Sequence, residues 1–197
     1  IEDYKYIDGV HFGEKKHWLH DDYVKFIRYG ENLVDRNGEG ILAFINNHSF
    51  IDNPTFRGMR WHLLQTFDKI FIINLHGNAL KKEVSPDRSK DENVFDIQQG
   101  VSINIFVRTK AKRKTEPAQV FYSDVWGKRE NKYAFLDEAK FDKLEFAKVE
   151  PRSPQYFFYP QDTQGLDNYN NGISIAELFP FKTVACVTGK DRINISW

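Results

Sequence analysis

The sequence contains one cysteine, Cys186, among 197 residues, so the chain cannot form an internal disulfide. Disulfide frameworks belong to secreted domains, and their absence fits the reducing cytosol. We therefore expect a cytoplasmic protein. A buried, inert thiol is the first interpretation of Cys186, and a reactive nucleophile is the alternative. No apolar run approaches the length of a membrane span and no signal peptide is visible, so we expect no membrane partner.

The chain also lacks net charge, because 28 lysines and arginines balance 28 aspartates and glutamates. Overall electrostatics therefore favour neither a nucleic acid nor a membrane as partner, and any basic site must be local. Apolar material is plentiful, since 41% of the residues are hydrophobic and 15% are aromatic. This composition predicts a globular protein of one to one and a half domains.

Several common chemical motifs are missing. The stretch "DGVHFGEKK" has neither the spacing nor the preceding strand of a phosphate-binding loop. Among the six histidines, His17 and His20 lie in a predicted loop, while His48 and His76 follow different predicted strands. None of these spacings is typical of a metal site, so we expect no metal. A Ser-His-Asp triad is recognised by geometry, so spacing alone does not test it.

The first half of the chain alternates predicted helices and strands. Helical spacing of apolar residues begins at Asp21 and ends at "NGEG". Residues 40–50 form an apolar run that predicts a strand covered on both faces. Asn53 and Pro54 predict the start of a second helix, and "KIFIINLHG" predicts a second buried strand. This order predicts an α/β fold with part of a doubly wound sheet.

The second half has a different character. Two β-rich stretches, "GVSINIFVRTK" and "AQVFYSDVW", predict a long hairpin whose first strand runs antiparallel to its neighbours. After Trp126 the chain becomes charged and helix-prone, so we expect domains at 1–126 and 127–197. A short helix is expected in "GISIAELFPF", ended by Pro180. The aromatic run "YFFYP" predicts core packing, with stacking on nucleic-acid bases as the alternative.

Polar residues end both buried strands, at positions 46–49 and 74–78. In an open parallel sheet ligands bind beyond the carboxyl ends of the strands, so this shared edge is a candidate site. The alternative is that the polar groups only cap helices and satisfy loop backbone.

Two basic clusters, "KKEVSPDRSK" and "RTKAKRK", could neutralise DNA phosphates or be solvated turns. Their members are Lys81, Lys82, Arg88 and Lys90 in the first, and Arg108, Lys110, Lys112, Arg113 and Lys114 in the second.

The stretches "DDYVKFIRYGE", "NPTFRGMR" and "DENVFDIQQGV" carry a resemblance to a known family. From about residue 21 to 189 the chain resembles the adenine-specific (N6) DNA methyltransferase region of large single-chain restriction-modification enzymes. The resemblance implies a partial Rossmann-like sheet, with parallel strands plus an antiparallel hairpin, followed by a small α+β segment. It also implies double-stranded DNA and the remainder of the methyltransferase polypeptide as partners.

The chain departs from this family at its two core motifs. It has neither the glycine-containing cofactor loop nor the Asn-Pro-Pro-Tyr tetrapeptide. The similar "DNPT" at 52–55 follows the wrong strand and lacks the second proline and the aromatic residue. We therefore expect the chain to begin just after the tetrapeptide, to contain no catalytic residue and to be inactive alone. S-adenosylmethionine is expected to bind only the intact enzyme.

The resemblance also implies residue roles. Phe95 of "ENVF" would form a wall of the pocket for the flipped target base, with Asn46, Asn47 and His48 lining its other side. The loop that carries Lys81, Lys82, Arg88 and Lys90 would approach DNA phosphates, and residues 127–197 would begin target recognition.

Alternatives stay open. Phe95 could be a core anchor. The chain could be a non-catalytic DNA-binding or specificity module that works with a separate methylase chain, or another α/β enzyme that uses the polar strand ends.

Overall fold

The computed structural model describes residues 1–110, 116–162, 164–165, 171–173 and 175–178. It divides the chain into two compact units, 1–160 and 161–197. In the second unit, α5 (Ile175–Leu178) confirms the short helix expected there. Pro180, Cys186, Lys112, Arg113 and Lys114 lie outside the described residues.

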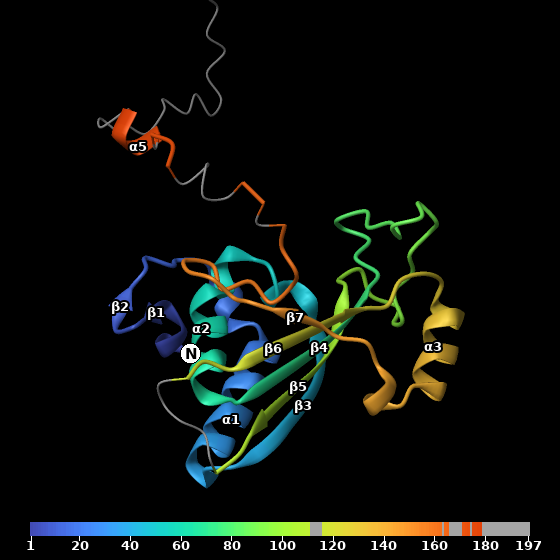
Figure 1. Cartoon of the computed structure of the whole chain (residues 1–197), viewed down its shortest axis with the longest axis horizontal. Coiled ribbons are helices and arrows are strands. Elements are labelled where there is room, and N and C mark those ends of the chain that lie inside the picture. Colours follow the sequence, from blue (N-terminus) through green and yellow to red (C-terminus); the bar gives the residue numbers. More distant parts are fainter. Residues whose placement is uncertain (111–115, 163, 166–170, 174, 179–197) are drawn as a thin grey trace, which may run out of the picture. The chain divides into compact units, whose positions relative to one another are not determined.

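The first unit is built on a five-stranded mixed sheet with strand order β3-β5-β4-β6-β7 (Figure 1). The strands are β3 (Gly40–Asn47), β4 (Lys69–His76), β5 (Val101–Arg108), β6 (Gln119–Asp124) and β7 (Ala147–Val149). β4 and β6 are parallel, and β5 is antiparallel to both β3 and β4. A separate small hairpin pairs β1 (Tyr6–Ile7) with β2 (Val10–His11). The predicted mixed α/β, partly Rossmann-like fold is confirmed.

The predicted hairpin of the two β-rich stretches is wrong. β5 lies between β3 and β4, while β6 pairs on the far side of β4. As a central strand β5 bonds along both of its edges, which a terminal hairpin strand does not. Its antiparallel direction was predicted correctly.

Two helices cover one face of the sheet. α1 (Asp22–Asn37) ends at Gly38, whose φ of 81° suits a glycine cap, and α2 (Arg57–Thr66) follows the cap that Asn53 provides. The larger core joins these helices to the inner sheet residues, including Ile70, Ile72 and Phe106. The predicted helix starts at Asp21 and Asn53 are confirmed to within a few residues. The short 3-10 helices are η1 (Glu2–Lys5), η2 (His17–His20), η3 (His48–Phe50), η4 (Pro54–Phe56) and η5 (Phe141–Lys143).

The opposite face is covered only in part. α3 (Arg129–Glu138) contributes Leu136 to a second core with Ile73, Leu75 and Val101. The β3 side chains on this face are open, since Ile41 is 69% and Ile45 is 50% exposed. The prediction that this strand is covered on both faces is therefore wrong: β3 is an edge strand of the described sheet and has no helix over its outer face.

Residues 127–160 belong to the first unit. β7 pairs with β6, and Phe158 of the aromatic run is fully buried in the larger core. The division between units therefore falls at 160–161, whereas the sequence predicted a boundary near 126. A target-recognition role for 127–197 stays a prediction. Within the described residues, no helix is long and apolar enough to cross a membrane.

Candidate functional site

The polar ends of β3 and β4 meet at one edge of the sheet, as predicted. Asn47 and His76, at the ends of the two strands, both pair with Val101 at the start of β5. The strand register shifts between Asn74 and His76, and His76 has a φ of 51°, which is rare for a residue other than glycine. Such a conformation re-aims a side chain, and it turns His76 toward His48 at the same edge.

Hydrogen bonds fix the tautomer of His48, which is 4% exposed. The Asn74 Oδ1 atom accepts the His76 backbone N–H at 3.1 Å, and Asn74 Nδ2 donates to the Tyr122 hydroxyl at 2.9 Å. The amide is thereby oriented, so His48 Nδ1, 3.0 Å from Asn74 Oδ1, must carry the proton. Its Nε2 then holds a lone pair, which faces Asn78 Nδ2 at 3.1 Å. Burial lowers the pKa of His48, in keeping with a neutral ring.

His76 is held by two acids and an indole. Its Nε2 lies 2.6 Å from Asp124 Oδ1, its Nδ1 lies 3.7 Å from Glu83 Oε1, and its ring stacks on Trp126. Burial favours the neutral ring, but the interactions with Asp124 and Glu83 outweigh it and raise the pKa of His76. Glu83 is also desolvated, yet His76 and the Asn78 amide lower its pKa.

His48, Asn74, His76 and Glu83 line a cavity of about 150 Å³ at the strand ends. A larger, more open cavity of about 550 Å³ lies beside it, over the loop that joins β4 to β5. Glu83 lines both cavities. A third cavity of about 260 Å³ lies near the start of α1.

The structure does not gather the four residues predicted for the target-base pocket around one cavity. Phe95 is 45% exposed and lines the larger cavity, His48 lines the small one, and Asn47 lines the third. Asn47 also caps η3 by accepting the Ser49 N–H. Asn46 is buried and bonds to Asn104 Nδ2 at 2.8 Å. Asn46 and Asn47 therefore have structural roles in this chain: Asn47 caps a short helix, and Asn46 satisfies a buried amide.

The predicted DNA-contacting residues fall into two separate groups. Lys81, Lys82, Arg88 and Lys90 are exposed in the β4–β5 loop, beside the cavities. Two of the four form ion pairs, Lys81 with Asp52 and Lys90 with Glu92.

The described members of the second basic cluster, Arg108 and Lys110, lie at the opposite end of the sheet. Arg108 ends β5 opposite Gly40, and β5 begins at the candidate site. Arg108 is mostly buried and pairs with Asp35, while the exposed Lys110 pairs with Glu39. A strand of eight residues puts roughly 25 Å between the two ends. Arg108 and Lys110 therefore do not form one surface with the basic residues of the β4–β5 loop.

Sequence reasoning missed Glu83, Tyr122, Asp124 and Trp126. A signal for the last three was present, because "YSDVW" ends a predicted strand in the same way as the polar ends of β3 and β4. The predicted hairpin did not place the end of this strand at the candidate site. The parallel pairing of β6 with β4 does so, because it brings Asp124 level with Asn74. Glu83 lies in a long loop, and the spatial position of a loop side chain cannot be predicted from the local sequence.

Comparisons with known proteins bear on this fold. No protein-family model matches the chain, and no curated protein matches it. Among solved structures, a cryo-EM structure of a DrdV–DNA complex superposes with a TM-score of 0.61 and 31% sequence identity, covering 72% of this chain and 14% of that one.

Two restriction-modification enzymes also share the fold. A nuclease-deletion mutant of the Type ISP enzyme LlaGI, in complex with a DNA substrate mimic, gives a TM-score of 0.62 at 24% identity, covering 76% of this chain and 14% of that one. The ATP-dependent Type ISP enzyme LlaBIII, bound to DNA, gives 0.60 at 22% identity, covering 84% and 12%. The chain thus has the fold of one region of these restriction-modification enzymes and spans about a seventh of the length of such structures.

Proposed function

We propose that this chain is a segment of an S-adenosylmethionine-dependent adenine-N6 DNA methyltransferase of a restriction-modification system. The observation that carries the proposal is the 31% identity to DrdV, a protein solved with DNA, across 72% of this chain. The family resemblance of "NPTFRGMR" and "DENVFDIQQGV" supports it independently. Because the described residues include no glycine-containing cofactor loop, we place S-adenosylmethionine binding and the catalytic tetrapeptide in the remainder of the polypeptide.

The larger cavity supports a role in holding a flipped base. Phe95 lines it, and a base removed from the stack needs an aromatic face to offset its lost stacking. Arg129 holds this wall in place, because its guanidinium donates to the Asn93 and Phe95 carbonyls at 2.7 and 3.0 Å. The wall is therefore pre-organised, which lowers the entropic cost of binding.

The exposed β4–β5 loop supports DNA contact beside that cavity. Lys82 and Arg88 have left-handed backbone conformations, with φ of 52° and 67°, in a loop that bridges Val84 to Lys90. Basic side chains there would reach phosphates on either side of an extruded nucleotide. We therefore assign the DNA footprint to this loop rather than to the Arg108 end of the sheet.

Fluorescence anisotropy of labelled duplex DNA, titrated with the chain at several salt concentrations, tests this assignment. We expect salt-dependent binding, and the Lys82→Gln/Arg88→Gln variant should make the salt slope shallower by roughly 0.9 per lost phosphate contact. Lys110→Gln is the matched control, because it removes an exposed cation at the opposite end of the sheet.

Equal weakening by Lys110→Gln would contradict the loop assignment. Binding that is independent of salt would contradict DNA contact altogether.

A further inference from the structure

The small cavity is lined by a buried imidazole nitrogen, His76 Nδ1, whose acidic neighbour Glu83 Oε1 lies 3.7 Å away, beyond hydrogen-bond distance. Within the part of the chain that the structure describes, His76 Nδ1 is buried and has no hydrogen-bond partner. The residue is only 5% exposed. A buried polar atom without a hydrogen-bond partner is destabilising, so it requires an explanation.

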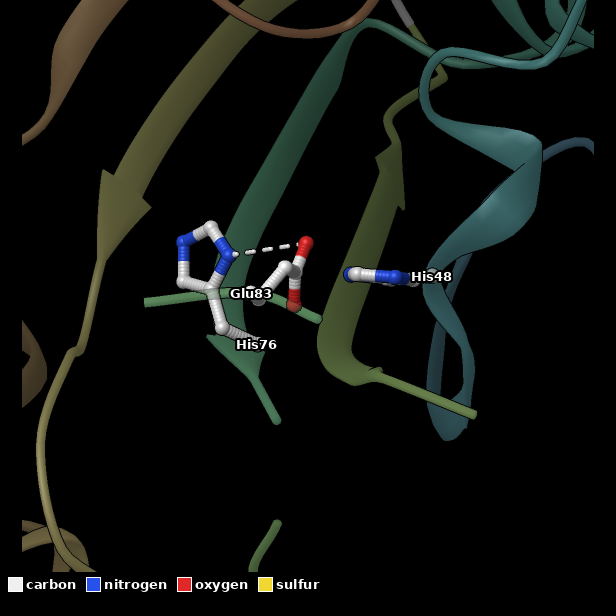
Figure 2. Close-up of side chains that lie close together, drawn as sticks. All are labelled: His48, His76 and Glu83. Atoms are coloured by element: carbon white, nitrogen blue, oxygen red, sulfur yellow. Dashed lines mark ion pairs between the residues drawn. The ribbon is translucent and has the colours of Figure 1, made fainter. Parts of the chain in front are cut away.

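His48 and Glu83 lie on the same side of this atom. Figure 2 shows the Glu83 carboxylate between the two imidazole rings, with the side chains coming from η3, β4 and the β4–β5 loop. One donor atom from each of His48, His76 and Glu83 lies within 4.8 Å of the other two. We propose that His48, His76 and Glu83 form a binding site for a divalent metal ion of the zinc type.

In the neutral form of each imidazole, the outer contact takes one N–H and leaves the lone pair on the nitrogen that faces Glu83 or Asn78. His76 Nε2 is held by the Asp124 carboxylate at 2.6 Å, which frees Nδ1 to face Glu83. His48 Nδ1 donates to Asn74, which leaves the lone pair on Nε2. A histidine ligand whose other N–H donates to a carboxylate or carbonyl is the usual arrangement around protein-bound zinc. The rings of His48 and His76 both have this arrangement, with Asn74 and Asp124 as the outer partners.

The distances and charges fit such an ion. Zinc bound at about 2.0–2.2 Å from a nitrogen and an oxygen separates them by roughly 3–4 Å, and His76 Nδ1 lies 3.7 Å from Glu83 Oε1. The two ligand atoms that lie farthest apart must approach each other by roughly 1 Å, which a side-chain rotation can provide. Asn78 Nδ2, which now faces His48 Nε2, would have to move aside. Glu83 and Asp124 supply negative charge against the cation.

Two imidazoles and one carboxylate favour zinc over magnesium, which prefers oxygen ligands alone. Three protein ligands leave a fourth tetrahedral position, and the cavity of about 150 Å³ has room for water there. The site does not depend on the proposed methyltransferase role, since it requires neither DNA nor S-adenosylmethionine.

Calorimetric titration of the chelator-stripped 197-residue chain with Zn²⁺ tests the proposal. We expect one saturable site. Glu83→Gln, which keeps the side-chain shape, should weaken binding by about 100-fold. Asp124→Asn, which removes the carboxylate that holds His76 Nε2 and also accepts the Tyr122 hydroxyl, should weaken it by about 10–100-fold. Co²⁺ on the unaltered chain should show the visible absorption of a tetrahedral site, which reports the geometry even if a variant unfolds.

Two control variants remove competing ligands. His17→Ala/His20→Ala deletes an exposed histidine pair whose rings lie 6.4 Å apart, and Cys186→Ser deletes the one thiol. Both should leave the affinity unchanged. The proposal is overturned if no saturable site is found, if Glu83→Gln binds as tightly as the parent, or if a control variant abolishes binding.

Discussion

At the scale of single residues, Gly100 makes room for the His48 ring. A Cβ atom added at Gly100 would lie 2.4 Å from His48 Cε1 and 2.5 Å from its Nε2. The Gly100 carbonyl also accepts the His48 backbone N–H at 3.0 Å, so the two residues are held against each other. The position of this ring in the candidate site therefore depends on the absence of a side chain at 100.

Gly100→Ala tests that dependence. We expect it to lower the free energy of unfolding by about 1–3 kcal/mol, because the ring must leave a well-packed position. Urea denaturation measures this change. The neighbouring exposed side chain allows a control, Gln99→Ala, which should stay within about 0.5 kcal/mol of the parent. A Gly100→Ala chain as stable as the parent would show that His48 moves freely.

At the scale of elements, a buried ion pair attaches α3 to the β4–β5 loop. Lys132 and Asp91 are both inaccessible at their side chains, with Lys132 Nζ 2.7 Å from Asp91 Oδ1. Lys132 Nζ also donates to the Leu75 and Glu92 carbonyls, each at 2.7 Å. Asp91 in turn accepts the Gly77 N–H. This one contact therefore holds together the end of β4, the loop beside both cavities, and α3.

Removing Lys132 leaves the Asp91 carboxylate buried without its opposite charge. We expect Lys132→Met to cost about 3–5 kcal/mol of unfolding free energy. Adding Asp91→Asn should recover part of that loss, because it removes the stranded carboxylate. Denaturant unfolding of the single and double variants measures both effects.

Lys128→Met, an exposed substitution near the start of the same helix, is the matched control. If the Lys132→Met and Lys128→Met chains were equally stable, the ion pair would not anchor α3.

At the scale of the whole molecule, the chain holds only part of the machinery that the proposed reaction needs. We expect no methyl transfer from labelled S-adenosylmethionine to duplex DNA by these 197 residues alone, because the cofactor loop and tetrapeptide of the family are not in the sequence. Filter binding of labelled DNA measures transfer. Transfer above a no-protein blank would refute this expectation and require a different catalytic centre.

Much of the fold could be predicted from the sequence. The starts of α1 and α2 and the strands at 40–47 and 69–76 each have a local cause: apolar period, capping residue or β-rich run. The helix-prone composition after Trp126 indicated α3. The shared edge of β3 and β4 was predictable as well, because consecutive strands joined by a helix run in the same direction.

Strand order and the grouping of side chains were not predictable in this way. β5 lies between β3 and β4 and forms hydrogen bonds with both. This pairing depends on residues that are distant along the chain. The same strand order sets β6 beside β4 and brings Asp124 to His76. The edge of the sheet was therefore determined by sequence periodicity. The cluster of His48, His76 and Glu83 at that edge was decided only by tertiary packing, because its members come from three segments that no local spacing relates.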